Sequence, residues 1–217
     1  MKIYHAWAQK IYTEFGIRHP AAHLHVLTPH GDLSLYFNVP LSLTPQKLNT
    51  FIEKESAIQT LTIKNNILNV DFTHTWWWQH LEPSQSISTK NTVIHTPLTT
   101  ITQKGRYIIQ LIQQINHHSQ RLFPHNSISD EKPSPSQDPL TTASETAMIK
   151  LCVVYGKTAA TKQKILYQQL VETFFSWWRE TCEPGNILRF IRPQDIDRTR
   201  QRLWLLNCLA KALHDKG

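Results

Sequence analysis

Cationic, aromatic and amide side chains recur along one flank of a helix that the apolar spacing predicts over residues 194–215. Arg200, Trp204, Asn207 and Lys211 follow one another at intervals of four, three and four residues, so they share one stripe of a helix. Guanidinium and ammonium groups bind phosphates, whereas rings and amides contact bases. The stripe predicts an RNA-binding surface. The alternative is an ordinary solvated flank with Trp204 buried against a neighbour.

Further arginines lie close to this stripe and add positive charge. The chain has a formal net charge of +7, and residues 140–217 hold 12 Lys and Arg against 7 Asp and Glu. Such an excess favours an anionic partner, of which RNA is a common one, although modest positive charge can also serve solubility alone. The predicted RNA-binding residues are Arg189, Arg192, Arg198, Arg200, Arg202, Trp204, Asn207 and Lys211.

A cluster of histidines is a candidate for metal chemistry. His19, His23, His25 and His30 are followed by Asp32, and a metal site built on imidazoles often includes a carboxylate. No known ligand spacing is matched, so a polar irregular loop is the favoured interpretation. We therefore predict neither a metal site nor a cofactor.

The run Trp76-Trp77-Trp78 is unusual because three successive side chains cannot all face one side. An exposed indole in the run would offer a stacking platform for a base or a patch for a protein partner. The favoured alternative is that the run is packed between the N-terminal part of the chain and the helices that follow, since large aromatic rings dominate buried surfaces.

The elements before residue 90 indicate a small α+β unit. Apolar residues at intervals of four predict a helix over residues 2–15, which Gly16 ends. Alternation predicts strands near 33–37 and 67–72, and Thr44-Pro45 predicts the start of a second helix, with Ile58 as a candidate for its apolar face. Residues 18–32 are expected to form a loop or irregular strand.

Residues 91–217 are predicted to form a helical domain. A long helix from residue 98 should end before Pro124, and further helices are expected over 144–155, 158–182 and 194–215. Four prolines among small polar residues predict a mobile loop at about 124–142. The predicted fold class is mainly α, a C-terminal helical bundle with a small N-terminal α+β unit.

Two C-terminal segments carry a resemblance to a known family. Residues 170–182, Leu-Val-Glu-Thr-Phe-Phe-Ser-Trp-Trp-Arg-Glu-Thr-Cys, are similar to the pattern Leu-Ala-x-x-Phe-x-x-Phe-Tyr-x-x-Cys, with the cysteine one residue late. Residues 202–206 are similar to Ala-Arg-Leu-x-Leu. The chain thus resembles the DALR-type anticodon-binding domain of arginyl- and cysteinyl-tRNA synthetases, most strongly over residues 166–217. The resemblance implies a helical bundle that holds the anticodon arm of a tRNA.

The chain departs from the family's patterns at some motifs, and an N-terminal segment is similar to a second domain of the same enzymes. Residues 105–109 stand where the synthetases carry a Tyr-Ala-His-Ala-Arg-like helix, and only Tyr107 remains. Residues 35–41 with the helix from Thr44 are similar to the small N-terminal domain of arginyl-tRNA synthetase, which contacts the tRNA elbow. The His-x-Gly-His-type and Lys-Met-Ser-Lys-Ser-type motifs of the catalytic core are absent. The resemblance therefore implies tRNA-binding parts without aminoacylation, and no enzyme is predicted.

The function predicted is noncatalytic binding of tRNA or another structured RNA. The alternatives are a protein-interaction or regulatory module derived from a synthetase domain, a metal-dependent enzyme built on the histidine cluster, and a relic without RNA affinity. Three cysteines without a CxxC pair argue against a disulfide framework or zinc knot. No signal-peptide pattern and no apolar run long enough to span a membrane is visible. A cytoplasmic location without a membrane partner is expected.

Overall fold

The chain is described by a computed structural model that covers residues 2–81, 100–123, 132–134, 140, 142–155, 160–181 and 195–214. It divides into two compact units, Met1–Trp77 and Trp78–Gly217. The division falls earlier in the chain than the expected boundary at residue 90. It lies inside a short helix, α3 (His74–Gln79), that contains the three tryptophans.

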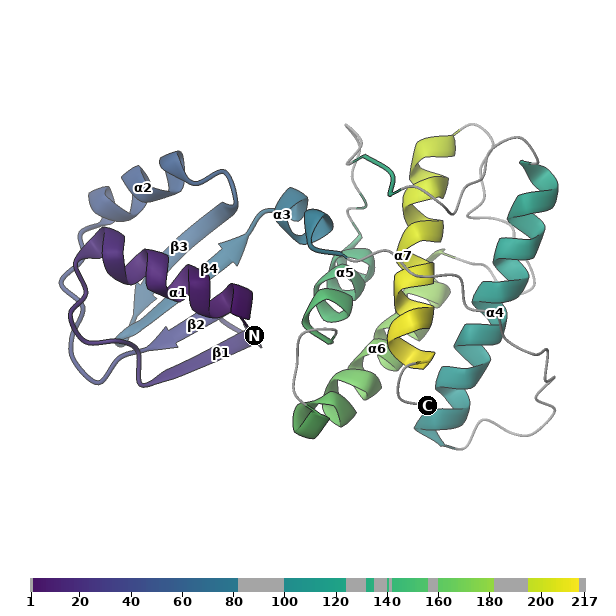
Figure 1. Cartoon of the computed structure of the whole chain (residues 1–217), viewed down its shortest axis with the longest axis horizontal. Helices are drawn as coiled ribbons and strands as arrows, with labels where there is room; N and C mark the ends of the chain where they lie inside the picture. Colours follow the sequence, from purple (N-terminus) through teal and green to yellow (C-terminus); the bar gives the residue numbers. More distant parts are fainter. Residues whose placement is uncertain are drawn as a thin grey trace. The chain divides into compact units, whose positions relative to one another are not determined.

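The first unit contains two copies of one arrangement, a helix followed by a β-hairpin. The first copy is α1 (Lys2–Phe15), β1 (His23–Thr28) and β2 (Gly31–Tyr36), and the second is α2 (Pro45–Lys54), β3 (Ile58–Lys64) and β4 (Ile67–Phe72). The strands form one antiparallel sheet in the order β1-β2-β4-β3 (Figure 1). The second strand of each hairpin is therefore central, and β1 and β3 are the edges.

One face of this sheet is aliphatic and forms the core of the unit. Leu33 pairs with Val70 and Leu35 with Leu68, and all four side chains are buried. The two helices lie side by side on this core, as shown by the rings of Phe15 in α1 and Phe51 in α2, whose centroids are 5.1 Å apart. Burial of this aliphatic surface explains why the strands alternate and why the helices are amphipathic.

Local signals begin and end the helices where the sequence predicts. Thr44 accepts a hydrogen bond from the backbone N–H of Lys47, with Pro45 at the first helical position of α2. Gly16 follows α1 with a φ of 62°, a left-handed conformation that glycine adopts without steric cost. The predicted helix over residues 2–15 and the predicted helix start at Thr44-Pro45 are confirmed.

Two edge strands differ from the sequence-based expectation. Residues 18–32, predicted as a loop or irregular strand, contain all of β1, whose exposed histidines alternate with half-buried apolar residues. Ile58, considered as part of the helix face, instead begins β3. A β-bulge between Ile58 and Thr60 breaks the two-residue alternation there. Both strands were missed because their apolar periodicity is weak.

The tryptophan run is buried, as the favoured interpretation expects, and the other interpretation, an exposed indole, is wrong. Trp76, Trp77 and Trp78 are 5%, 1% and 1% exposed. Their indole N–H groups have separate partners: Trp77 Nε1 donates to Asp32 Oδ2 at 2.9 Å, and Trp78 Nε1 donates to the Pro133 carbonyl at 3.0 Å. A short helix turns successive rings in different directions. Trp76 and Trp77 both pack against Tyr4 and Phe72, and Trp78 is held by the Pro133 carbonyl.

The second unit is a helical bundle, as predicted. It consists of α4 (Ile101–Leu122), α5 (Ala143–Tyr155), α6 (Ala160–Thr181) and α7 (Ile196–His214). α4 begins with a capping box, in which Thr100 and Gln103 satisfy each other's backbone N–H groups. α5 packs on α6, and α7 packs on α4 and α5. In Figure 1, α7 lies between α4 on one side and α5 and α6 on the other.

A few residues of the predicted mobile loop at 124–142 are described by the structure. Lys132 Nζ donates to the carbonyls of Gln79 and Leu81 at 2.9 and 2.8 Å. Gln201 of α7 donates to the Ser134 carbonyl at 3.4 Å. The mobility of the segment stays a prediction, and most of it lies outside the described residues.

Gly105 of α4 lies against Tyr167 of α6. A Cβ atom added at Gly105 would overlap the Tyr167 phenol, whose buried hydroxyl has no hydrogen-bond partner among the described residues. We expect Gly105→Ala to lower the free energy of unfolding by about 1–3 kcal/mol through overpacking, despite the helix propensity that alanine adds. Urea unfolding of the variant measures this loss.

Tyr167→Phe provides the control for this prediction. The single variant is expected to be nearly neutral, since the hydroxyl bonds to nothing, and Gly105→Ala with Tyr167→Phe should recover part of the loss. A Gly105→Ala protein as stable as the parent would show that the two helices do not approach as closely as described.

Candidate nucleic-acid interface

The predicted stripe on α7 is only partly buried. Trp204 is 3% exposed, and the half-buried Asn207 accepts a hydrogen bond at 2.7 Å from Asn116 Nδ2 of α4. Buried residues occupy most of the circumference of α7 between Thr199 and Leu213, where neighbouring helices pack on it, and Arg200, Asn207 and Lys211 form its half-exposed flank. The expectation of a tryptophan turned toward solvent is therefore wrong, and Trp204 serves the core.

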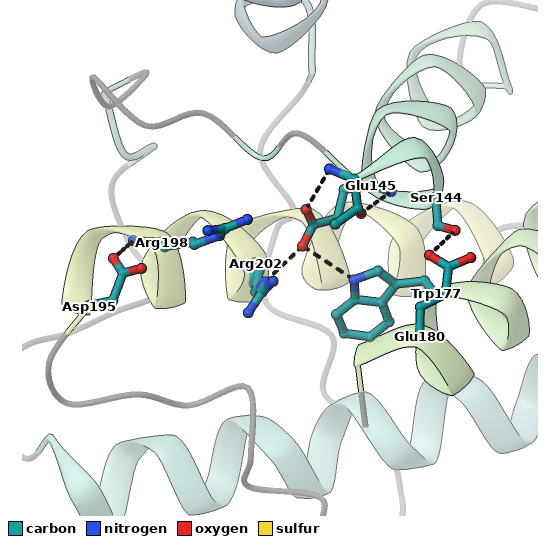
Figure 2. A network of polar contacts seen from close by, with 8 residues as sticks. Ser144, Glu145, Trp177, Glu180, Asp195, Arg198 and Arg202 are labelled. Atoms are coloured by element: carbon teal, nitrogen blue, oxygen red, sulfur yellow. Dashed lines mark hydrogen bonds and ion pairs between the residues drawn. The ribbon is translucent and has the colours of Figure 1, made fainter. Parts of the chain in front are cut away.

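Arg202 is also committed to the interior. Its Nε donates to Glu145 Oε1 at 2.7 Å, and the Glu145 side chain is completely buried. Figure 2 shows the Trp177 indole directed at the same carboxylate, to which its Nε1 donates at 3.3 Å. A guanidinium held in this way is not free to bind a phosphate, so the predicted role of Arg202 is corrected to a structural one.

Glu145 joins three helices through this carboxylate. It lies in the first turn of α5, where Thr142 Oγ1 accepts from its backbone N–H and Thr142 N donates to its Oε2. Burial by itself would raise the pKa of Glu145. The charge of Arg202 and the hydrogen bonds from Arg202, Trp177 and Thr142 outweigh burial and hold that pKa below its usual value. The carboxylate thus holds α5, α6 and α7 in register.

The remaining predicted residues have different environments. Arg198 is half-buried in the first turn of α7, where its backbone N–H donates to Asp195 Oδ1 at 3.2 Å. Arg200 and Lys211 are half-exposed. Arg189 and Arg192 lie outside the described residues. Of the eight predicted residues, Arg200 and Lys211 keep partly exposed cationic groups for which the structure records no ion pair with another described residue.

A cationic surface that the sequence analysis passed over lies on α4. Its 22 residues contain three Lys and Arg and no Asp or Glu. The side chains opposite the buried Ile108, Ile112 and Ile115 are exposed. We define the α4 face as five of these exposed residues, Arg106, Tyr107, Gln114, His117 and Arg121.

The α4 face combines the groups that contact nucleic acids. Arg106 and Arg121 are fifteen residues apart, which is about 22 Å along a helix axis. The Tyr107 ring is 37% exposed between them, and Gln114 and His117 add neutral hydrogen-bonding groups. The Asn116–Asn207 hydrogen bond joins the flank of α4 to α7, and Lys211 lies one turn beyond Asn207.

The histidine cluster is not assembled into a conventional metal site. His23 and His25 are exposed neighbours on β1. The Asp32 carboxylate, however, accepts hydrogen bonds from Phe72 N and Trp77 Nε1, both at 2.9 Å. Within the described part of the chain, no three His, Cys, Asp or Glu residues come together in a way that could hold a metal ion.

Comparisons of the chain with protein-family models, with curated proteins and with solved structures gave no significant match. Among the helices that the structure describes, none combines the length and apolar character needed to cross a membrane.

Proposed function

We propose that this chain is a noncatalytic RNA-binding protein that holds tRNA or another structured RNA on the α4 face. The observation that carries the proposal is a 22-residue helix without a single carboxylate whose exposed side carries two guanidinium groups, a phenol, an imidazole and an amide. Arg200 and Lys211 of α7 would contribute at the edge. Most protein contacts to nucleic acids are made to the phosphates and sugars, which this composition suits.

The absence of acidic residues on α4 matters as much as the cations. A carboxylate within a few ångströms of a phosphate would oppose binding, and exposed helices usually mix both signs. Phosphate contacts by Arg106 and Arg121 would fix an RNA along the helix, leaving Tyr107 and Gln114 to contact sugars or bases. The resemblance of residues 166–217 to tRNA anticodon-binding domains supports the same class of ligand.

Salt dependence tests this proposal. Fluorescence anisotropy with labelled bulk tRNA is expected to show binding that weakens as salt rises. Three or four phosphate contacts would lower the affinity by about 40- to 150-fold between about 50 and 200 mM salt. Absence of binding at the lowest salt, or binding that does not respond to salt, would rule out the proposal.

A further inference from the structure

Two exposed imidazoles lie side by side on the edge strand β1 of the first unit. His23 and His25 are two residues apart on β1, so their side chains leave the same face. Both residues are exposed, and their ring centroids are 6.3 Å apart. Tyr36, the register partner of His23, places its ring centroid 5.1 Å from that of His25.

In the strand register, Asp32 and Asp71 are the acidic residues nearest to the two histidines, and both carboxylates already accept hydrogen bonds. Asp32 accepts from Phe72 N and Trp77 Nε1, while the Asp71 carboxylate accepts from Thr60 Oγ1 and from Asp32 N. The ligands that the pair offers are therefore imidazole nitrogens without a carboxylate. Such a set suits copper(II), nickel(II) or zinc(II) and does not suit magnesium or calcium, which require oxygen ligands.

The separation of the rings is compatible with chelation. An imidazole nitrogen binds these ions at about 2.0–2.1 Å, which places the centroids of two rings on one ion roughly 5 Å apart. The observed 6.3 Å exceeds this by a small amount. Rotation of two exposed side chains about their own torsions closes that difference without a change in the backbone.

We propose that His23 and His25 form a bidentate site for a divalent transition-metal ion, with solvent or an external ligand filling the remaining positions. Copper(II) should bind more tightly than zinc(II), following the general order of affinities for nitrogen ligands. The site is independent of RNA binding by α4.

Titration of the full chain with copper(II) chloride, followed by calorimetry and by NMR of the imidazole groups, tests the proposal. We expect one copper ion to bind most tightly and to perturb the His23 and His25 resonances together. His23→Asn and His25→Asn should each weaken this binding at least tenfold.

A matched control comes from His117 and His118, whose ring centroids are 6.2 Å apart, almost the same separation. These two are consecutive on a helix, so their side chains diverge and do not form a chelate. His117→Asn with His118→Asn should leave the tightest copper site unchanged. Loss of binding in this variant, or unchanged binding in both His23→Asn and His25→Asn, would overturn the proposal.

Discussion

Replacing Arg106 and Arg121 together with glutamate is expected to weaken tRNA binding by at least about 100-fold at low salt. Each substitution removes one charge-assisted contact to a phosphate, worth about 1.5–3 kcal/mol, and introduces a repelling charge. Both side chains are exposed, so the fold should be unaffected, as circular dichroism can verify. The salt dependence of the remaining binding should also become shallower, because two phosphate contacts are lost.

Lys164→Glu with Arg179→Glu is the matched control for this pair. Both residues are exposed cations on α6, so the change in net charge is identical. This control should reduce tRNA affinity only a few-fold, through the general field of the protein. Equal losses in the two double variants would mean that RNA responds to net charge alone, and the α4 face would lose its assigned role.

Glu145→Ala is expected to lower the free energy of unfolding by about 3–5 kcal/mol, the range for removing one partner of a buried ion pair. The substitution leaves Arg202 and the Trp177 indole without their shared acceptor and removes the hydrogen bond from Thr142 N to the Glu145 side chain at the start of α5. Urea unfolding measures the loss. Glu145→Gln, which keeps an acceptor oxygen but no charge, should lose less.

The contribution of Glu145 to the free energy of unfolding should decrease as the pH falls. Its pKa is lower in the folded protein than in the unfolded chain, so the ionised form stabilises the fold. That stabilisation is complete above the unfolded pKa, about 4.3, and is lost as the pH falls through the folded value. The stability difference between the parent and Glu145→Gln should therefore be constant from pH 7 to 5 and shrink below about pH 4. A difference that grows on acidification would contradict the pairing.

The helices with strong local signals could be predicted from the sequence. Thr44-Pro45 determines the start of α2 because the threonine caps the helix and the proline suits its first position. The strands β1 and β3, which were not predicted as regular strands, lack such local signals. In β1 the exposed positions are histidines and the inward positions are only half-buried, so the contrast that periodicity detects is small.

Some site residues were misassigned because the apolar spacing along one helix does not show how many other helices pack against it. A surface helix with one buried stripe was expected for α7, whereas α4, α5 and α6 pack on it and leave only the flank of Arg200, Asn207 and Lys211 half-exposed. Trp204 suits a core as well as an RNA surface, and only packing decides between them. The partner of Arg202 is Glu145, 57 residues away in the chain, which no local pattern shows.

The α4 face, by contrast, was accessible to sequence reasoning. Ile108, Ile112 and Ile115 recur at helical spacing in the sequence, and the exposed side follows from them by geometry. The lack of Asp and Glu over residues 101–122 is visible in the sequence. Only Tyr107 matches the family pattern at residues 105–109, and the predicted RNA contacts were placed on α7.

Photo-cross-linking to tRNA that carries 4-thiouridine tests the location of the RNA most directly. Trypsin cleavage after Arg106 and Arg121 isolates residues 107–121, which include three members of the α4 face between the two arginines. We predict that this peptide carries the main cross-link, and that an excess of unlabelled tRNA lowers the yield of this cross-link. Cross-links confined to other peptides, with none on residues 107–121, would contradict RNA binding by α4.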